Sequence, residues 1–176
     1  MKKFTTLIAA ATLGWAVQSL AVTAPPPDEL VKVTVGEVLT VGARLRRVEV
    51  LSAAHTVPAV GFAVEGTQSD GSICWWVYTG DTGPNPALWN RLRSMNVSHL
   101  VIETAFSNEE QQLAQLSSHL CPTTLARELV QLAGRVDVRI SHIKPGEMFS
   151  VMSEIGRLAM RHRVQALAIG AVMSLG

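Results

Sequence analysis

Five side chains that can bind a metal or transfer a proton are spread along this 176-residue chain: His55, Asp81, Glu103, His119 and His142. Each is expected at the C-terminal end of a strand or in the loop beyond it. Because α/β folds gather their chemistry at such strand ends, the five groups are expected to meet at one rim of a sheet. Histidine and aspartate are suitable ligands for zinc or manganese. Together, the five residues favour a metal-dependent site.

Asp81 has the clearest setting of the five. Residues 75–78 are apolar and aromatic and predict a buried strand. Gly80 and Pro84 lie on either side of Asp81 and predict a turn directly after that strand. The alternative is that Asp81 only caps the helix predicted over residues 86–95.

The other histidines and the cysteines offer no further site. His99 and His162 do not follow this pattern, and we interpret them as ordinary structural residues. A histidine at a strand end is also more often structural than a ligand, so the prediction rests on the five residues together. Cys74 and Cys121 do not make a disulfide framework, and two cysteines exclude a cysteine-rich zinc site.

The segments that must position these residues change character midway along the chain. Alternating apolar residues predict a meander of short antiparallel strands over residues 30–41, 45–51, 57–64 and 74–78. Helical spacing then predicts helices over 86–95, 108–116, 122–132 and 147–162, with strands over 99–103, 136–140 and 164–173. Strands followed by alternating strands and helices predict a sheet covered by helices.

Length and charge limit the classes of function. The chain has 176 residues, 48% of them hydrophobic, which suits one domain with a real core. Its formal net charge of +1 argues against non-specific nucleic-acid binding through a broad basic face. We therefore expect a small-molecule substrate and no nucleic-acid partner.

The first 24 residues differ in composition from the domain predicted over residues 25–176. Lys2 and Lys3 precede an apolar run, and small residues at 19–21 resemble a signal-peptidase site. Cleavage after residue 21 would place the protein in the periplasm. The alternative is a helix that packs on the domain of a cytoplasmic protein, and the run is too short for a convincing membrane span.

Five runs of sequence resemble the metallo-β-lactamase-fold phosphodiesterases, and among them the bacterial 3′,5′-cyclic-nucleotide phosphodiesterases. The runs lie in the family's order and spacing, at residues 55–62 (His-Thr-Val-Pro-Ala-Val-Gly-Phe), 79–82 (Thr-Gly-Asp-Thr), 102–106 (Ile-Glu-Thr-Ala-Phe), 118–122 (Ser-His-Leu-Cys-Pro) and 141–146 (Ser-His-Ile-Lys-Pro-Gly). This resemblance implies an α+β fold, the αββα metallo-β-lactamase sandwich.

The resemblance also implies a role for each of the five residues. His55 and His142 match metal ligands of the family, and Asp81 matches the carboxylate that bridges two metals, zinc or else manganese or iron. Glu103 and His119 match the acid and histidine that act near the leaving group. A two-metal site polarises a phosphate and generates hydroxide, and a carboxylate-oriented histidine can protonate the departing oxygen.

One part of the family pattern is missing. The main metal-binding motif, His-x-His-x-Asp-His, belongs upstream of His55, and no histidine precedes His55 in this chain. We therefore expect weak metal binding and a sandwich that lacks most of its N-terminal half. Half a sandwich leaves an apolar sheet face to be covered, which predicts a homodimer through that face, cover by the N-terminal segment, or a piece of a longer protein.

Three functions remain open. The first is hydrolysis of 3′,5′-cyclic nucleotides such as cyclic AMP, impaired by the missing motif. The second is an RNase Z-like tRNA 3′ endonuclease. The segment between His55 and Asp81 is short and has no basic insertion of the kind that grips tRNA, which weakens this alternative. The third is a catalytically dead remnant that serves in binding or oligomerisation.

Overall fold

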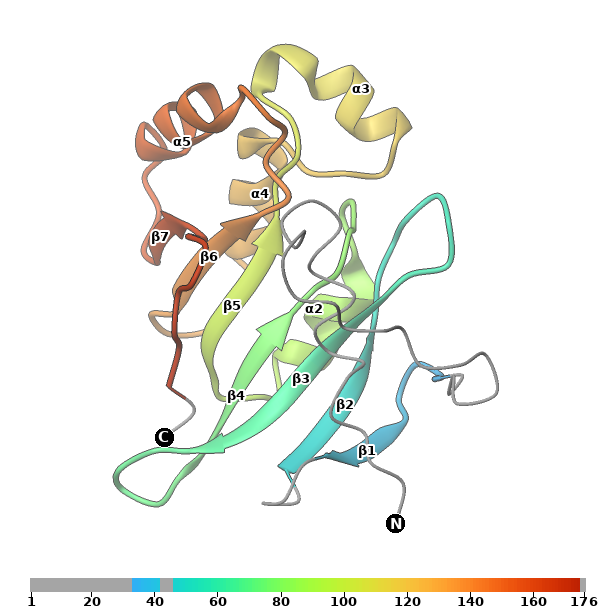
Figure 1. The fold of residues 1–176 in the computed structure, drawn as a ribbon, viewed down its shortest axis with the longest axis vertical. Helices are drawn as coiled ribbons and strands as arrows, with labels where there is room; N and C mark the ends of the chain where they lie inside the picture. Colours follow the sequence, from blue (N-terminus) through green and yellow to red (C-terminus); the bar gives the residue numbers. More distant parts are fainter. Residues whose placement is uncertain (1–32, 42–45, 175–176) are drawn as a thin grey trace.

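The computed structural model describes residues 33–41 and 46–174. A single sheet of seven strands, arranged in sequence order, forms the framework (Figure 1). The strands are β1 (Val38–Val41), β2 (Arg46–Ser52), β3 (Val60–Thr67), β4 (Ile73–Tyr78), β5 (Val97–Glu103), β6 (Asp137–Ser141) and β7 (Arg163–Ala166).

The sheet is antiparallel in its first half and parallel in its second. Strands β1 to β4 pair antiparallel, as the alternating pattern predicted, and β4 to β7 pair parallel. A tight turn joins β3 to β4, and its Gly71 has a φ of +84°, which glycine adopts without strain. Parallel strands need long crossover connections, and the helices supply them.

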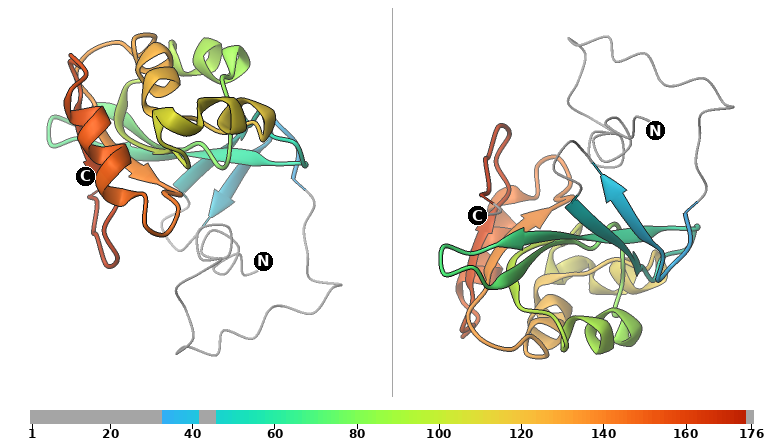
Figure 2. Two further views of the ribbon diagram at one scale, coloured as in Figure 1. Left: turned by 90° about the horizontal axis from the view of Figure 1, so that it is seen from above. Right: turned by 90° about the horizontal axis from the view of Figure 1, so that it is seen from below.

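Within the described residues, four helices accompany the strands: α2 (Pro86–Leu92), α3 (Gln111–Leu116), α4 (Pro122–Leu129) and α5 (Met148–Gly156), with a 3-10 turn, η2 (Asn108–Glu110), leading into α3. Figure 2 shows α2, α3 and α4 together on one face of the sheet. Helix α5 packs against α4 and β7. Helices on one face of one sheet agree with the partial sandwich that the resemblance implied.

The main core lies between the sheet and these helices. Trp89 of α2 is 1% exposed and packs in a cluster with sheet residues such as Val77, Leu100 and Ile140. The Trp89 indole N–H donates to the carboxylate of Glu128 on α4, so its one polar atom is paired inside the core. Burial of this apolar face is the main contribution to the stability of the domain.

The face of the sheet away from these helices is apolar over β3 and β4 and polar over β6. Phe62 and Trp76 belong to its apolar part, and the indole Nε1 of Trp76 donates to the sulfur of Met173 at 3.3 Å. Over β6, by contrast, Arg139 donates to Asp137 at 2.9 Å. This face therefore carries apolar side chains over β3 and β4 and an ion pair over β6. The homodimer through this face stays a prediction.

Several predicted elements are shorter in the structure. The helix predicted over 147–162 ends at Gly156, and the strand predicted over 164–173 ends at Ala166. Glycine is a poor helix residue, and Gly170, with a φ of +77°, turns the chain after β7. The spacing of apolar residues identifies the helices and strands more accurately than it identifies the residues at which they end.

None of the helices within residues 33–41 and 46–174 combines the length and hydropathy needed to cross a bilayer. The apolar segment predicted over residues 1–24, its signal-peptide interpretation and the domain boundary at residue 25 lie outside the described residues.

His162 has the structural role that the sequence assigned to it. It is 8% exposed; its Nε2 donates to the Leu129 carbonyl at 3.0 Å, and its Nδ1 accepts from the Val136 N–H at 3.3 Å. The ring thus ties the end of α4 to the start of β6 in its neutral form. Burial lowers the pKa of His162, because the charged ring loses hydration.

This lowered pKa predicts a loss of stability in mild acid. The unfolded chain binds a proton at this residue more readily than the folded chain does, so the free energy of unfolding falls as the pH drops through about 6.5, the ordinary histidine pKa. Urea unfolding of the wild type and His162→Gln at pH 7 and pH 5 measures the effect. We expect a smaller acid loss in the variant; equal losses would contradict the assignment.

Candidate active site

The five candidate residues are carried by five different segments. His55 lies in the loop from β2 to β3, Asp81 follows β4, and Glu103 is the last residue of β5. His119 lies between α3 and α4, and His142 follows β6. The structure brings them together at the C-terminal edge of β4, β5 and β6, as the pattern of strand ends predicted.

Backbone contacts fix the loops that carry His55 and Asp81 to each other. The Ala54 N–H donates to the hydroxyl of Thr82 at 2.9 Å, and the Gly83 N–H donates to the Ala54 carbonyl at 2.8 Å. Gly80, with a φ of +66°, allows the turn between β4 and Asp81. Turn residues therefore fix the positions of His55 and Asp81, the two candidate metal ligands on these loops.

Glu103 is the fixed point of the site. It is completely buried and accepts hydrogen bonds from four donors: His119 Nδ1 at 2.8 Å and the backbone N–H groups of Ala105 at 3.1 Å, Thr82 at 3.2 Å and Leu120 at 3.3 Å. An ionised carboxylate can only accept hydrogen bonds, so these four donors suit Glu103 in its ionised form. The charge of Glu103 thus holds the His119 ring and the loops around it.

His119 connects Glu103 to His55. Its Nδ1 faces Glu103, and its Nε2 lies 3.4 Å from Nε2 of His55, with the two rings edge to face. Nδ1 of His55 accepts from the Val57 N–H. These contacts assign one consistent neutral arrangement, in which His55 donates through Nε2 and His119 donates through Nδ1.

Asp81 and His142 form a second pair beside the first. Oδ1 of Asp81 lies 2.9 Å from Nδ1 of His142, and both side chains are partly exposed. Their hydrogen bond lowers the pKa of Asp81 and raises the pKa of His142. His142 stacks on His119 at a centroid distance of 5.2 Å, so the two pairs form one continuous cluster.

The backbone around the cluster is unusual at two positions. His142 and Ser118 have positive φ angles of 59° and 56°. Residues other than glycine adopt this region at a cost, and such strain is concentrated at functional sites. His142 thus turns out of β6 directly at its end, where its ring meets Asp81 and His119.

The cluster has the donor chemistry of a metal site but not a complete set of ligands. Within the described ranges, no group of three or more His, Cys, Asp or Glu side chains is arranged to hold a metal ion. Protein zinc sites use three or four such ligands. Asp81 and His142 are adjacent, but each satisfies the other, and His55 is engaged with His119. The described residues alone therefore do not fit a tightly held metal.

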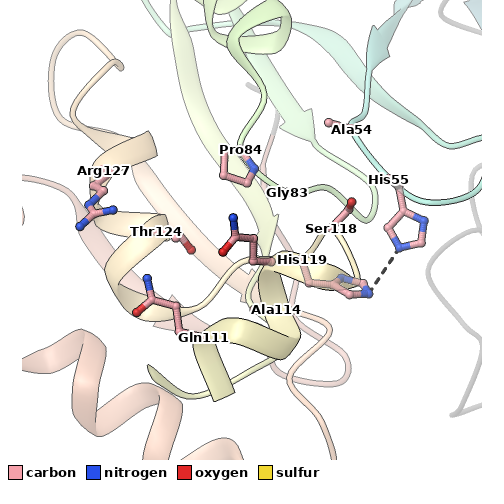
Figure 3. A pocket seen from close by; sticks show the side chains of 11 residues that line it. Ala54, His55, Gly83, Pro84, Gln111, Ala114, Ser118, His119, Thr124 and Arg127 are labelled. Atoms are coloured by element: carbon pink, nitrogen blue, oxygen red, sulfur yellow. Dashed lines mark hydrogen bonds between the residues drawn. The ribbon is translucent and has the colours of Figure 1, made fainter. Parts of the chain in front are cut away.

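A cavity of about 470 Å³ opens beside His55 and His119 (Figure 3). Residues of α3, α4 and the loops that follow β2, β4 and α3 line it: Ala54, His55, Gly83, Pro84, Gln111, Ala114, Gln115, Ser118, His119, Thr124 and Arg127. Figure 3 shows His55 and His119 at one end and Arg127 at the other. Asp81, Glu103 and His142 are not among the lining residues.

Sequence reasoning missed several residues of this region. Thr82 joins the His55 loop to Glu103. Gln111 and Arg127 line the cavity without belonging to any motif. The helical spacing predicted the buried face of α4, with Leu125 and Leu129, but it was wrong for α3, where the regularly spaced Leu113 and Leu116 are exposed and Ala114 is buried. The spacing gave no sign that the two helices line a cavity.

No protein-family model matches the chain, and no curated protein matches it. Among solved structures, the metallo-β-lactamase fold protein YhfI from Bacillus subtilis matches with a TM-score of 0.59 and 18% identity, over 78% of this chain and 52% of YhfI. Human tRNase Z, short form, matches at 0.45 and 15% identity, over 56% of this chain and 36% of that enzyme. A long-form RNase Z from yeast matches at 0.48 and 17% identity, over 56% and 13%.

The likeness to YhfI shows that this chain has a metallo-β-lactamase fold, which confirms the fold inferred from the five sequence runs. The chain spans about half the length of YhfI. The likeness shows the fold and leaves the substrate and the metal to be established.

Gly80 offers a direct test of how the Asp81 turn is held. A Cβ at Gly80 would lie 2.5 Å from the Val60 carbonyl oxygen, whereas one at Gly134, which has a similar φ of +69°, would meet nothing within 4 Å. We expect Gly134→Ala to cost about 1 kcal/mol in unfolding free energy from backbone strain. Gly80→Ala should cost roughly 1–3 kcal/mol more from overpacking. Equal losses in urea unfolding would show that the contact is unimportant.

Proposed function

We propose that this domain belongs to a phosphodiester hydrolase of the metallo-β-lactamase fold, with 3′,5′-cyclic nucleotides such as cyclic AMP as substrates. The observation that carries the proposal is the buried Glu103, 2.8 Å from Nδ1 of His119, directly beside the Asp81–His142 pair. A histidine oriented by a carboxylate at the edge of an open cavity suits general acid catalysis.

In this proposal, Glu103 and His119 have different roles in the reaction. Glu103 keeps the His119 ring in one orientation, with Nε2 beside His55 at the end of the cavity where the phosphate would lie (Figure 3). When the oxygen of a water molecule bonds to phosphorus and the bond from phosphorus to the ribose oxygen breaks, His119 donates a proton to the leaving ribose oxygen. The hydrogen bond to Glu103 engages Nδ1 of His119, which leaves Nε2 as the ring atom that can transfer a proton.

His55, Asp81 and His142 are the residues we propose as metal donors, for two zinc ions or for manganese or iron. Because the described residues do not complete a site, we expect weak binding, as the missing upstream motif predicted. Isothermal titration with Zn²⁺ and with Mn²⁺ should give dissociation constants weaker than about micromolar, and Asp81→Asn should weaken binding further. Sub-micromolar affinity in the wild type would contradict this expectation.

Hydrolysis of cyclic AMP is the test of the function. With added Zn²⁺ or Mn²⁺, we expect slow hydrolysis that EDTA abolishes. His119→Ala should lower the rate by about 10²–10⁴-fold, the usual value of a general acid. His99→Ala, a change at a histidine on the sheet away from the cluster, serves as the matched control and should retain the rate.

Two other outcomes would decide between the competing functions. Cleavage of a pre-tRNA 3′ trailer without cyclic AMP hydrolysis would favour the RNase Z-like alternative. The connection from His55 to Asp81 holds little more than the β3–β4 hairpin, which gives that alternative no tRNA-binding insertion. The absence of both activities with metal present would favour a catalytically dead remnant.

A further inference from the structure

The cavity beside His55 and His119 is much larger than the cluster needs to hold a phosphate. Its volume of about 470 Å³ falls in the range of sites that enclose small organic ligands. His55 and His119 line only one end of it (Figure 3). A substrate whose ester oxygen lies at His119 would therefore extend a second chemical group towards α3 and α4.

The cavity walls carry polar side chains with unused hydrogen-bonding capacity. The side chains of Gln111, Gln115, Ser118 and Arg127 make no hydrogen bond or ion pair with any part of the chain that the structure describes. The Thr124 hydroxyl, by contrast, is engaged with Cys121. Four free polar groups around one cavity form a surface that a polar ligand can satisfy.

The composition of the walls favours a neutral, flat group over a second phosphate. Arg127 is the one lysine or arginine among the described lining residues, and none of these is acidic. Gln111 and Gln115 add amides that can both donate and accept, and Pro84 and Ala114 add apolar surface. A nucleobase has both features, an apolar face and an edge of donors and acceptors.

We propose that this cavity is a purine-binding subsite, in which Arg127, Gln111 and Gln115 contact the base of a nucleotide whose phosphate lies at the histidine cluster. Purines are favoured because guanidinium and carboxamide groups form paired hydrogen bonds with purine edges. The inference deepens the proposed function and rests on it, since that function places the phosphate beside His119.

Binding in EDTA tests the subsite without requiring catalysis. The full chain is titrated with adenosine 5′-monophosphate, uridine 5′-monophosphate and ribose 5-phosphate, which lacks a base, and binding is measured by calorimetry. We expect the adenine nucleotide to bind about tenfold or more tightly than either comparison ligand, a difference typical of one good base contact.

Matched variants locate the base. Arg127→Met and Gln115→Leu should reduce affinity for the adenine nucleotide to that for ribose 5-phosphate. Arg135→Met and Gln112→Leu change residues of the same types that do not line the cavity, so they should retain wild-type affinity. All four residues are exposed, and a thermal unfolding curve of each variant verifies that it folds.

Equal affinity of the wild type for all three ligands would overturn the purine subsite, and so would equal losses in the cavity variants and their controls. This outcome is separate from the failure of the proposed function. Cyclic AMP hydrolysis without base-selective binding would contradict the purine subsite but not the proposed function. Base-selective binding without hydrolysis would support the subsite and refute the catalytic proposal.

Discussion

The burial of the Glu103 carboxylate is the constraint on which the site depends. An ionised group without water must be surrounded by donors, and Glu103 obtains them from the turn after β4, the end of β5 and the loop before α4. Each of these segments is thereby fixed relative to the others. His119 is the one side-chain donor among them, so the same constraint that orders the loops also orients its ring.

The second pair, Asp81 and His142, is built differently. Both side chains are partly exposed, and the backbone around them is shaped by left-handed residues, Gly80 before Asp81 and His142 itself. Their mutual hydrogen bond keeps Asp81 charged and favours a charged His142. Stacking of His142 on His119 joins this accessible pair to the buried one. The cluster thus combines a rigid acid–base pair with a pair of open donors.

The one-sided packing of the sheet shapes the rest of the molecule. The helices between β4, β5 and β6 provide the crossover connections that let these strands run parallel. The C-terminal ends of the strands then share one edge, where the cluster lies. The same arrangement places α3 and α4 beside that edge. Their polar side chains, with Gln111 and Arg127, therefore line a solvent-accessible cavity next to His119.

The sequence by itself determined the elements, the fold and the five cluster residues. Periodicity marks the strands and helices, and turn residues after apolar runs, such as Gly80, mark the strand ends where polar groups gather. The resemblance already implied that Glu103 and His119 act together, and tertiary structure added the pairing of Asp81 with His142. Tertiary structure also decided the cavity, because Gln115 and Arg127 are ordinary surface residues of their helices until the folded chain brings α3 and α4 together. Pairing and enclosure depend on distances between segments far apart in the chain, and local spacing does not encode those distances.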